Sequence, residues 1–383
     1  MKPRVVIVGG GFGGAYTLRR LVRHCSVTLI NPTEHFLFTP LLHEYLAGTV
    51  SICSVMFPYS TVVHPQKYTF VQGRATHIDL QSKRVYANEI WYPYDYLVLA
   101  IGSRSNYKII KGSETYSSGL KSIADADNFL HELRTLLTSR KESVIVSIIG
   151  GGPTGIELAT ELARHHPLAE ENHTYYTINL IHSGETFLPE QSDYFSQEVE
   201  RVLRKLNVHV HYHSRVSEVT KQAIILHDGS VLHSDLTLFT AGVIPHTVQT
   251  EPSVTLDKGF FVVNEFLQLP DFPDVFALGD CAAFSHNNHY APQLAQVAVA
   301  QAPIVAKNMR RLIKGKSLKP YHFHLQGFLV SLGQKRAVAQ ISRVKFRGFP
   351  AWFIWRTVYL IKLPGLGNKL RVMWDWTKGL LRN

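Results

Sequence analysis

Cysteine is scarce in this sequence, with three cysteines among 383 residues, at positions 25, 53 and 281. None of them is close to another along the chain, and an odd number cannot all pair. The sequence therefore favours a reduced, intracellular protein over a secreted, disulfide-stapled one. No CxxC or CxxxxC pair is present, which argues against an enzyme that works through a dithiol relay.

Long hydrophobic runs are also missing. No stretch of 18 apolar residues exists, so we expect no transmembrane helix. The apolar stretch Val5–Val8 is too short for the core of a secretory signal, and it runs directly into glycines. With 45% hydrophobic and 18% charged residues the composition is globular, and the length suggests about two to three domains.

Histidine is common, with 20 residues, but no metal-ligand spacing is found among them. His209, His211 and His213 alternate, which predicts three imidazoles on one face of a strand. No cysteine or acidic cluster completes a site beside them, so we predict solvated side chains and no bound metal. The role of this histidine-rich strand is left open.

The net charge of +11 is unevenly distributed. Residues 343–383 contain nine Lys or Arg and one Asp, which gives +8 and leaves +3 for the other 342 residues. The basicity thus belongs to a tail and not to the body of the protein. We predict no nucleic-acid partner and look to the tail for the surface it would bind.

Two pairs of similar segments reveal an internal repeat. The segment Ile7–Gly14 lies parallel to Ile148–Gly155 at an offset of 141 residues. Asp95–Gly102 lies parallel to Asp235–Gly242 at an offset of 140. Because both offsets nearly agree, the chain is predicted to contain a duplicated nucleotide-binding module, each copy ending in a buried strand followed by glycine.

The first copy opens with a GxGxxG loop. The β-branched run Arg4–Val8 predicts a buried parallel strand, and Ala15–Val22 predicts the helix that follows. Between them stand Gly9, Gly11 and Gly14, which suit a tight turn, a close approach to a pyrophosphate and close helix–strand packing. The helix N-terminus offers N–H groups to the phosphates.

The second loop has the same context. Ser143–Ile149 predicts a strand and Ile156–Ala163 a helix, with Gly150, Gly152 and Gly155 between them. Again the three glycines fall where a dinucleotide phosphate needs backbone and no side chain.

The strand after each loop ends without the usual acid. Val27–Ile30 is followed by Asn31, which can hydrogen-bond a ribose hydroxyl but carries no charge. Ile178–Ile181 is followed by His182, which can accept a ribose hydroxyl, tolerate a 2′-phosphate, or be an incidental loop residue. The choice between NADH and NADPH therefore stays open.

The first module is expected to resume after the second, at the buried strand of Asp274–Asp280. Its final acid can accept hydrogen bonds from a sugar-like chain. In this order of elements the sequence resembles the two-dinucleotide-binding flavoprotein superfamily. The resemblance implies an α/β fold of two Rossmann-like domains, with the NAD(P) domain inserted in the FAD domain. It also implies that Asp280 contacts the ribityl–phosphate region of FAD.

Further segments sharpen the resemblance. The chain is similar to type II NADH:quinone oxidoreductases over nearly its whole length, at His35–Leu42, Ser118–Ser122, Gly152–Glu157, Ala295–Ala298 and Gly327–Ala337. The resemblance implies an enzyme that does not pump protons. It passes a hydride from NADH or NADPH to FAD and then two electrons to a membrane quinone.

The same resemblance implies the cofactor contacts. Those to FAD would come from Gly9, Gly11, Phe12, Gly14, Asn31, Thr39, Pro40, Ala100, Gly102, Asp280 and Ala295. Those to the nicotinamide nucleotide would come from Gly150, Gly152, Pro153, Thr154, Gly155, His182, Ala241 and Gly242.

Three residues match family positions close to the chemistry. Glu157 matches a glutamate near the nicotinamide and the quinone route, although an acid in the first helical turn can also complement the helix dipole. Lys335 matches a lysine near the flavin ring, or is a surface charge. Gln296 matches the first glutamine of an AQxAxQ motif. The later glutamine position holds Ala300, with Gln301 next to it, which leaves the quinone unidentified.

The basic tail predicts two helices, Phe349–Leu363 and Leu366–Leu381, broken at Pro364-Gly365. Four of the five tryptophans lie in the tail, which favours a membrane interface over a helix pair covering a dimer interface or core. In the second helix the predicted apolar face is Leu366, Leu370, Met373, Thr377 and Leu380. The predicted polar face is Arg371, Asp375, Lys378 and Arg382, with Trp374 and Trp376 on the flanks.

These segments divide the chain as follows. We predict FAD-domain parts at 1–115 and 249–312, the NAD(P)H domain at 116–248, interface strands at 313–342 and membrane-anchoring helices at 343–383. The expected location is a membrane surface, at the cytoplasmic face or in an equivalent reducing compartment. The sequence leaves a homodimer open.

Two alternative functions remain. A sulfide:quinone oxidoreductase would need redox-active cysteines, and Cys53 and Cys281 have no recognisable motif for this role. A flavoprotein that senses NAD(H) with little turnover stays possible because Asn31, His182 and Ala300 depart from the family pattern.

Overall fold

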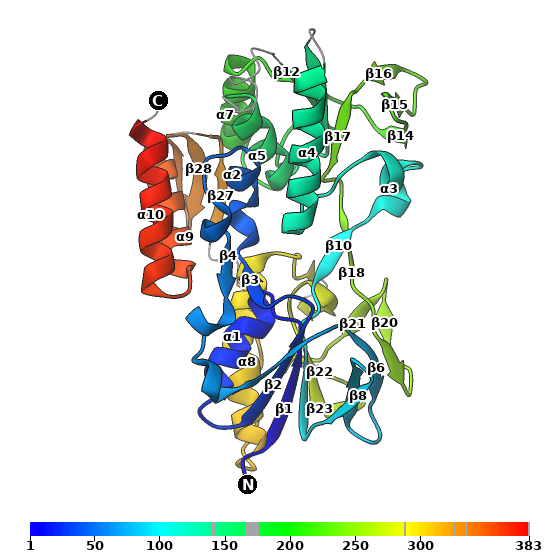
Figure 1. The fold of residues 1–383 in the computed structure, drawn as a ribbon, viewed down its shortest axis with the longest axis vertical. Helices are drawn as coiled ribbons and strands as arrows, with labels where there is room; N and C mark the ends of the chain where they lie inside the picture. The colour runs from blue at the N-terminus through cyan, green and yellow to red at the C-terminus, as the bar shows by residue number, and fades with distance from the viewer. Residues whose placement is uncertain (140–142, 165–175, 287–288, 325–326, 334, 382–383) are drawn as a thin grey trace. The chain divides into compact units, whose positions relative to one another are not determined.

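The computed structural model describes residues 1–139, 143–164, 176–286, 289–324, 327–333 and 335–381. The chain packs into two compact units, each assembled from separated stretches of sequence (Figure 1). Unit 1 comprises Met1–Leu37, Met56–Arg104 and Ile244–Leu325, and unit 2 comprises Phe38–Val55, Ser105–Val243 and Gln326–Asn383. The domain boundaries expected from sequence stay a prediction, because they divide the chain by nucleotide module and these units divide it by packing.

Unit 1 is built on a six-stranded sheet in which β1 (Arg4–Val8) lies between two parallel neighbours. Residues Val5–Val8 are buried, as the β-branched sequence of a central parallel strand requires. In order across the sheet the strands are β22 (Gln268–Leu269), β23 (Phe272–Ala277), β9 (Tyr96–Leu99), β1, β2 (Ser26–Asn31) and β5 (Thr69–Gln72).

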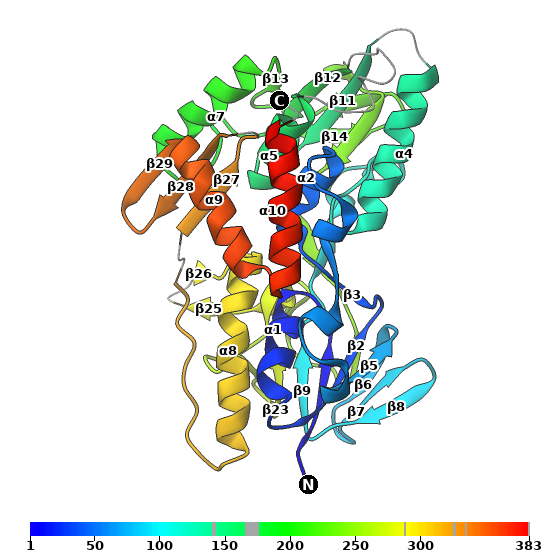
Figure 2. The same cartoon turned by 60° about the vertical axis from the view of Figure 1, so that its left-hand side comes forward.

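Helices α1 (Phe12–Leu21) and α8 (Ala295–Leu312) pack together in unit 1 (Figure 2). A four-stranded sheet in the same unit consists of β19 (Gln249–Glu251), β6 (Ala75–Asp79), β7 (Arg84–Ala87) and β8 (Ile90–Pro93). The smaller sheets are β20 (Leu256–Asp257), β21 (Phe260–Val262) and β24 (Ala282–Ala283), then β3 (His35–Leu37) with β4 (Met56–Pro58), then β25 (Ser285–His286) with β26 (His289–Tyr290).

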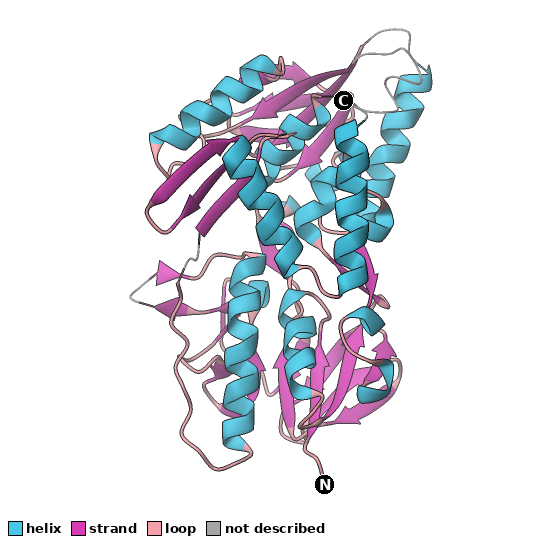
Figure 3. Ribbon diagram, turned by 90° about the vertical axis from the view of Figure 1, so that its left-hand side faces the viewer, coloured by secondary structure: helices cyan, strands magenta, loops and turns pink. Residues whose placement is uncertain are grey.

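Unit 2 contains a second parallel sheet, flanked by helices as in unit 1 (Figure 3). Its strands are β13 (His209–His211), β12 (Tyr176–Ile181), β11 (Val144–Ile149) and β17 (Leu236–Phe239). The helices are α2 (Leu42–Leu46), α3 (Ser113–Tyr116), α4 (Ile123–Ser139), α5 (Pro153–Leu162) and α7 (Asp193–Lys205), and α2 packs on α4 and α5. An antiparallel sheet is formed by β14 (Val216–Val219), β15 (Ala223–Leu226) and β16 (Val231–His233).

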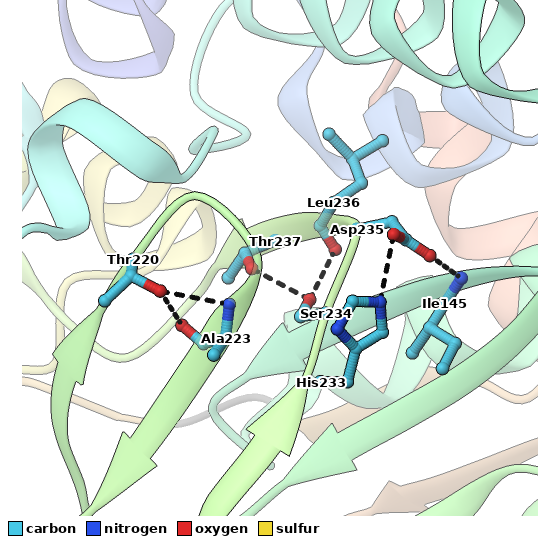
Figure 4. A network of polar contacts seen from close by, with 8 residues as sticks. All are labelled: Ile145, Thr220, Ala223, His233, Ser234, Asp235, Leu236 and Thr237. Carbon is cyan, nitrogen blue, oxygen red and sulfur yellow. Dashed lines mark hydrogen bonds and ion pairs between the residues drawn. The ribbon is translucent and has the colours of Figure 1, made fainter.

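The duplication extends to individual hydrogen bonds at the start of the modules. Arg4 N–H donates to Asp95 Oδ2 at 2.7 Å, and Asp95 N–H donates to Arg4 O at 2.9 Å. Ile145 N–H donates to Asp235 Oδ2 at 2.8 Å (Figure 4). In return, Asp235 N–H donates to Ile145 O at 2.9 Å. The two repeated aspartates therefore fasten the closing strand of each module to its opening strand by the same pair of contacts.

The C-terminal part of unit 2 is a three-stranded antiparallel sheet followed by two helices. Its strands are β27 (Gly327–Ser331), β28 (Ala337–Ile341) and β29 (Val344–Gly348). Helix α9 (Phe349–Lys362) packs on this sheet, and α10 (Leu366–Leu381) contacts α9. The break falls at Pro364-Gly365, as predicted, and Gly365 has a φ of +77° that favours glycine.

The histidine-rich segment differs from its prediction. Strand β13 ends at His211, and His213 lies beyond it with a φ of +51°. Only two of the three histidines are therefore strand residues, because the chain turns toward Ser214, whose N–H bonds His182 O.

Candidate functional site

The glycines of the first loop are of two kinds: some are packed so closely that a side chain would clash, and one faces open space. A Cβ on Gly9, whose φ is +98°, would lie 2.2 Å from Ala100 O, and one on Gly14 would lie 1.8 Å from Gly9 O. A Cβ on Gly11 would meet no atom within 4 Å among the described residues. Gly9 and Gly14 are thus required by the fold, whereas Gly11 leaves space that a phosphate can approach.

The second loop repeats this division. A Cβ on Gly155 would lie 1.8 Å from Gly150 O, and Gly150 itself has a φ of +114°. Gly152 again meets nothing described within 4 Å. Each unit therefore has one open loop glycine, Gly11 in unit 1 and Gly152 in unit 2.

Both helices begin three residues earlier than predicted, at Phe12 and Pro153 and not at Ala15 and Ile156. Gly14 and Gly155, the last glycines of the two loops, therefore lie in the first helical turn, where the helix packs closely against the strand. The N-cap residues are Gly11 and Gly152, which have no side chain to occupy the first N–H groups. Those N–H groups can therefore receive an anion.

Asn31 and His182 lie against the middle glycines of their loops. Asn31 Oδ1 accepts a 2.8 Å hydrogen bond from Gly10 N–H, and its amide donates to Thr33 O at 2.9 Å. A Cβ on Gly151 would lie 2.6 Å from His182 Nδ1. The other ring nitrogen of His182 is 2.9 Å from the carbonyl oxygen of Thr186. Since a carbonyl only accepts, Nε2 carries the hydrogen, and Nδ1 of the neutral ring is an acceptor.

The sheet topology gathers the other predicted residues at two edges. In unit 1, Gly9, Ala100 and Asp280 follow the neighbouring parallel strands β1, β9 and β23, so they share the carboxyl edge where such sheets bind ligands. In unit 2, Gly150 and His182 follow β11 and β12. The remaining residues of these edges are Gly102 after β9, and Ala241 and Gly242 after β17.

Asp280 is positioned by two neighbours in unit 1. Ser103 Oγ donates to Asp280 Oδ2 at 2.7 Å, and Gly279 N–H donates to Gln301 Oε1 at 2.7 Å. Gln301 is 1% exposed. Gln301, which stands next to the later glutamine position of the AQxAxQ motif, thus holds the turn before Asp280. The half-buried Ala295 and Gln296 begin α8 in the same unit.

Four predicted residues of unit 2 lie outside its sheet edge. Thr39 and Pro40 form a short 3-10 helix, Thr39–Leu41, with Thr39 exposed. Lys335 is exposed in the turn between β27 and β28, with a φ of +58°. Because α5 begins at Pro153, Glu157 falls in the second helical turn and not in the first.

Glu157 belongs to a buried polar cluster that sequence reasoning missed. Its Oε1 accepts a 3.1 Å hydrogen bond from Ser331 N–H, and its Oε2 is 3.7 Å from His43 Nδ1. Glu44 and Glu161 are buried in the same unit. Burial raises the pKa of Glu157 to about 8 and lowers the pKa of His43 to about 3. The available signal was His43-Glu44, an imidazole next to a carboxyl group within the largely apolar run from 36 to 46.

The two C-terminal helices present an exposed apolar surface, which we call the tail face. Its members are between 46% and 74% exposed: Phe349, Phe353, Ile361, Leu366, Leu370, Met373 and Trp374. No helix in the described part of the chain combines the length and apolarity needed to span a bilayer.

Two residues of α10 do not lie where the sequence predicted. Trp376 was expected on a flank of the exposed face but is 5% exposed. Asp375 was expected on the outer polar face but accepts hydrogen bonds from Ser51 and Ser54. The reason is that α10 buries a stripe at spacing four, Asn368, Val372 and Trp376. Arg382 lies outside the described residues.

Comparison with known proteins agrees with this geometry over the whole chain. The pyridine nucleotide-disulphide oxidoreductase family matches residues 3–302, and the NDH2 C-terminal domain family matches residues 325–382. A solved structure of NDH2 from Plasmodium falciparum in complex with NADH has the same fold, with a TM-score of 0.90 at 20% identity. The match covers 99% of this chain and 98% of that one.

Curated relatives span nearly the same length. A probable NADH dehydrogenase of Dictyostelium discoideum is 29% identical, over 99% of this chain and 90% of the relative. The type II NADH:quinone oxidoreductase Ndh of Mycobacterium tuberculosis is 30% identical, over 98% of this chain and 88% of the relative. The family resemblance and the fold class predicted from sequence are thereby confirmed. The chain belongs to the type II NADH:quinone oxidoreductases, within the pyridine nucleotide-disulphide oxidoreductase family.

Proposed function

We propose that this chain is a peripheral membrane flavoenzyme that binds FAD on the first glycine loop, oxidises NADH on the second, and reduces a membrane quinone. The observation that carries the proposal is the open glycine of each loop, Gly11 or Gly152, beside an uncapped helix N-terminus. A dinucleotide pyrophosphate needs both a close backbone approach and free N–H donors.

The residues around Asp280 fit FAD in particular. The carboxylate of Asp280, which follows β23, would accept hydrogen bonds from the hydroxyl groups of a ribityl chain. Ser103 would hold this carboxylate in place, and Gln301 would fix the preceding turn. Bound FAD would supply the hydride-accepting and electron-donating chemistry, and the chain would orient it and exclude water.

His182 supports NADH as the donor in place of NADPH. With Nε2–H committed to Thr186 O, the ring offers the acceptor Nδ1 beside the loop. An acceptor suits a ribose 2′-hydroxyl, whereas a 2′-phosphate needs donors. We propose that Asn31 shapes the first loop through Gly10 and contacts the ribose of FAD only secondarily.

Roles for the remaining site residues are part of the same proposal. Glu157, largely protonated near neutral pH because burial raises its pKa to about 8, would give a proton to the reduced quinone. Gln296 would contact the quinone from the first turn of α8. Lys335 and the Thr39-Pro40 segment would contact the flavin ring.

The tail face supports attachment to a membrane. Its apolar residues are exposed on both α9 and α10, and basic residues such as Arg371 and Lys378 are exposed beside them. This combination is typical of helices lying in an anionic bilayer surface. We propose a location at the cytoplasmic face of a membrane or in an equivalent reducing compartment.

The test is anaerobic mixing of the purified protein with NADH or NADPH, followed by addition of quinones in liposomes. We expect NADH to bleach the flavin absorbance faster than NADPH, and a lipophilic quinone to restore it. Failure of both nucleotides to bleach the flavin would overturn the proposal. Bleaching without reoxidation by any quinone would favour an NAD(H) sensor with little turnover.

The sulfide:quinone alternative loses support at Cys281. This thiol is buried, donates to Leu278 O at 3.3 Å, and has its pKa raised to about 11 by burial. It therefore stays a thiol at neutral pH, whereas sulfur transfer requires a thiolate.

A further inference from the structure

Four titratable side chains lie together in unit 2, and we call them the acid cluster. They are His43 and Glu44 on α2, and Glu157 and Glu161 on α5. One nitrogen or oxygen from each of His43, Glu44 and Glu161 lies within 4.8 Å of the others. His43 Nδ1 is 3.7 Å from Glu157 Oε2, so the imidazole lies close to all three carboxyl groups. Such separations are spanned by one water molecule or a small rotation.

Charged and polar groups face the acid cluster from each element packed on it. Arg356 on α9 attracts Glu44 and Glu161, and Arg164 after α5 attracts Glu161. Trp376 on α10 donates to Glu44, and Tyr359 on α9 lies near Glu157. Arg336 repels Arg164.

In the part of the chain that the structure describes, the carboxyl groups of the acid cluster outnumber the cations beside them. Among the described residues the acid cluster has three carboxyl groups and two guanidinium partners, and burial keeps His43 neutral. Burial also raises the pKa of Glu157 and of Glu161 to about 8. At neutral pH the acid cluster therefore retains protons, chiefly on Glu157 and Glu161.

The positive charges beside the acid cluster favour a bound proton over a bound metal ion. His43, Glu44 and Glu161 are residue types that ligate divalent cations, but Arg356 and Arg164 already supply positive charge beside them. The imidazole supports a proton instead. His43 Nε2 is buried without a hydrogen-bond partner among the described residues, while Nδ1 faces Glu157. An imidazole with one committed and one vacant nitrogen can take a proton on one side and release it on the other.

We propose that His43, Glu44 and Glu161 form a proton relay that reloads Glu157 in each turnover. The inference rests on the proposed function, in which NADH, one proton and a quinone give NAD⁺ and a quinol. Glu157 would release its proton to one quinone oxygen, and the reduced flavin would supply the two electrons and the second proton that complete the quinol. His43 would then pass a proton from Glu161 or Glu44 to the Glu157 carboxylate, and solvent would replace it.

The test separates the two half-reactions by stopped flow between pH 6 and 9. We expect Glu161→Gln and His43→Gln to slow reoxidation of the reduced flavin by quinone by about tenfold or more, and to leave reduction by NADH unchanged. The exposed Glu132→Gln makes the same substitution outside the acid cluster and should match the wild type in both steps. Equal slowing of both half-reactions by the acid-cluster variants would indicate a structural role and overturn the relay.

Two further measurements do not depend on turnover with NADH. Flavin reduced by dithionite can be mixed with quinone, so failure of NADH as donor is distinguished from failure of the relay. Infrared titration of buried carboxylic C=O groups should show a band that disappears as pH passes about 8 and is weakened in Glu161→Gln. No such band in the wild type, or a stoichiometric metal ion lost in Glu161→Gln, would contradict the proposal.

Discussion

The indole Nε1–H of Trp376 donates a 2.7 Å hydrogen bond to Glu44 Oε2, and both side chains are buried. The two residues are 332 positions apart in sequence. Nearby, Asp375 Oδ2 accepts from Ser51 Oγ at 2.6 Å and from Ser54 Oγ at 2.8 Å. One face of helix α10 is thus hydrogen-bonded to the rest of unit 2, and another face exposes apolar side chains. The helix is therefore both a core element and a candidate membrane surface.

Replacing Trp376 should test the core role. Trp376→Phe removes the donor to a buried carboxyl group. We therefore expect the free energy of unfolding, measured in urea, to fall by about 1–3 kcal/mol. Trp374→Phe is the matched control, because Trp374 is 60% exposed on the same helix and should change stability by less than about 0.5 kcal/mol. Equal losses in the two variants would contradict the assignment of Trp376 to the core.

Polar substitutions on the tail face should release the protein from membranes. Each large apolar side chain buried in the bilayer interface contributes about 1.5–3 kcal/mol, so Phe353→Ser with Leu370→Ser should weaken binding to anionic vesicles on the order of a hundredfold. Flotation measures the binding, and higher salt should weaken it further because basic residues contribute. Removal of the whole tail is a poorer test, since it also deletes Trp376.

The control for this experiment is Ile90→Ser, which changes an equally exposed apolar residue of unit 1, outside the tail face. It should float like the wild type. If the double variant still floats, the membrane assignment is wrong. If the double variant instead lowers the oligomeric state measured by size exclusion, the tail face pairs with a second copy of the chain.

The loop glycines should separate folding from nucleotide binding. Gly155→Ala would place a Cβ 1.8 Å from Gly150 O, a backbone atom that cannot move aside, so we expect a destabilised unit 2. Gly152→Ala meets nothing described within 4 Å and should leave the melting temperature unchanged while weakening NADH affinity, because the methyl group would occupy the space of the pyrophosphate. Calorimetric titration and thermal unfolding distinguish the two. Unchanged NADH affinity in Gly152→Ala would show that the second loop does not hold the nucleotide.

The acid cluster predicts a stability that falls as pH rises. Glu157 and Glu161 have pKa values raised from 4.5 to about 8, so between these values the folded protein retains protons that the unfolded chain releases. As pH rises through that window, each group should lower the free energy of unfolding by up to about 1.4 kcal/mol per pH unit. His43, with its pKa lowered from 6.5 to about 3, acts in the opposite direction below pH 6.5. The fall should therefore be clearest between pH 6.5 and 8.

Thermal unfolding across this range provides the measurement. Glu161→Gln should flatten the dependence and raise the melting temperature at pH 8, while Glu132→Gln should keep the wild-type slope. A slope that is the same in all three proteins would mean that the carboxyl groups ionise in the folded state as they do in water.

The features that the sequence predicted well are those imposed by local geometry. The glycines at 9, 14, 150 and 155 are required by backbone contacts within a few residues of chain or across one strand pair, so their spacing alone identifies them. The aspartates at 95 and 235 stood out because the duplicated module repeats their contacts. The helix break at Pro364-Gly365 was equally local.

The features that were missed depend on partners distant in sequence. Gln301 could not be assigned because its partner, Gly279, lies in another element. Trp376 looked interfacial because composition does not reveal which tryptophan of a helix meets a buried acid. The acid cluster stayed hidden for the same reason, since His43-Glu44 and Glu161 meet only when α2 packs on α5.

Unit 2 is assembled from three separated stretches of sequence, and this has a consequence for biosynthesis. The strand–helix core of the second module is complete soon after residue 243 leaves the ribosome, but Glu44 must wait for Trp376. Until then Glu44 and the apolar sides of α2 and α5 lack their cover. The nascent chain therefore carries an incompletely covered apolar surface through most of its translation, and such a surface favours aggregation.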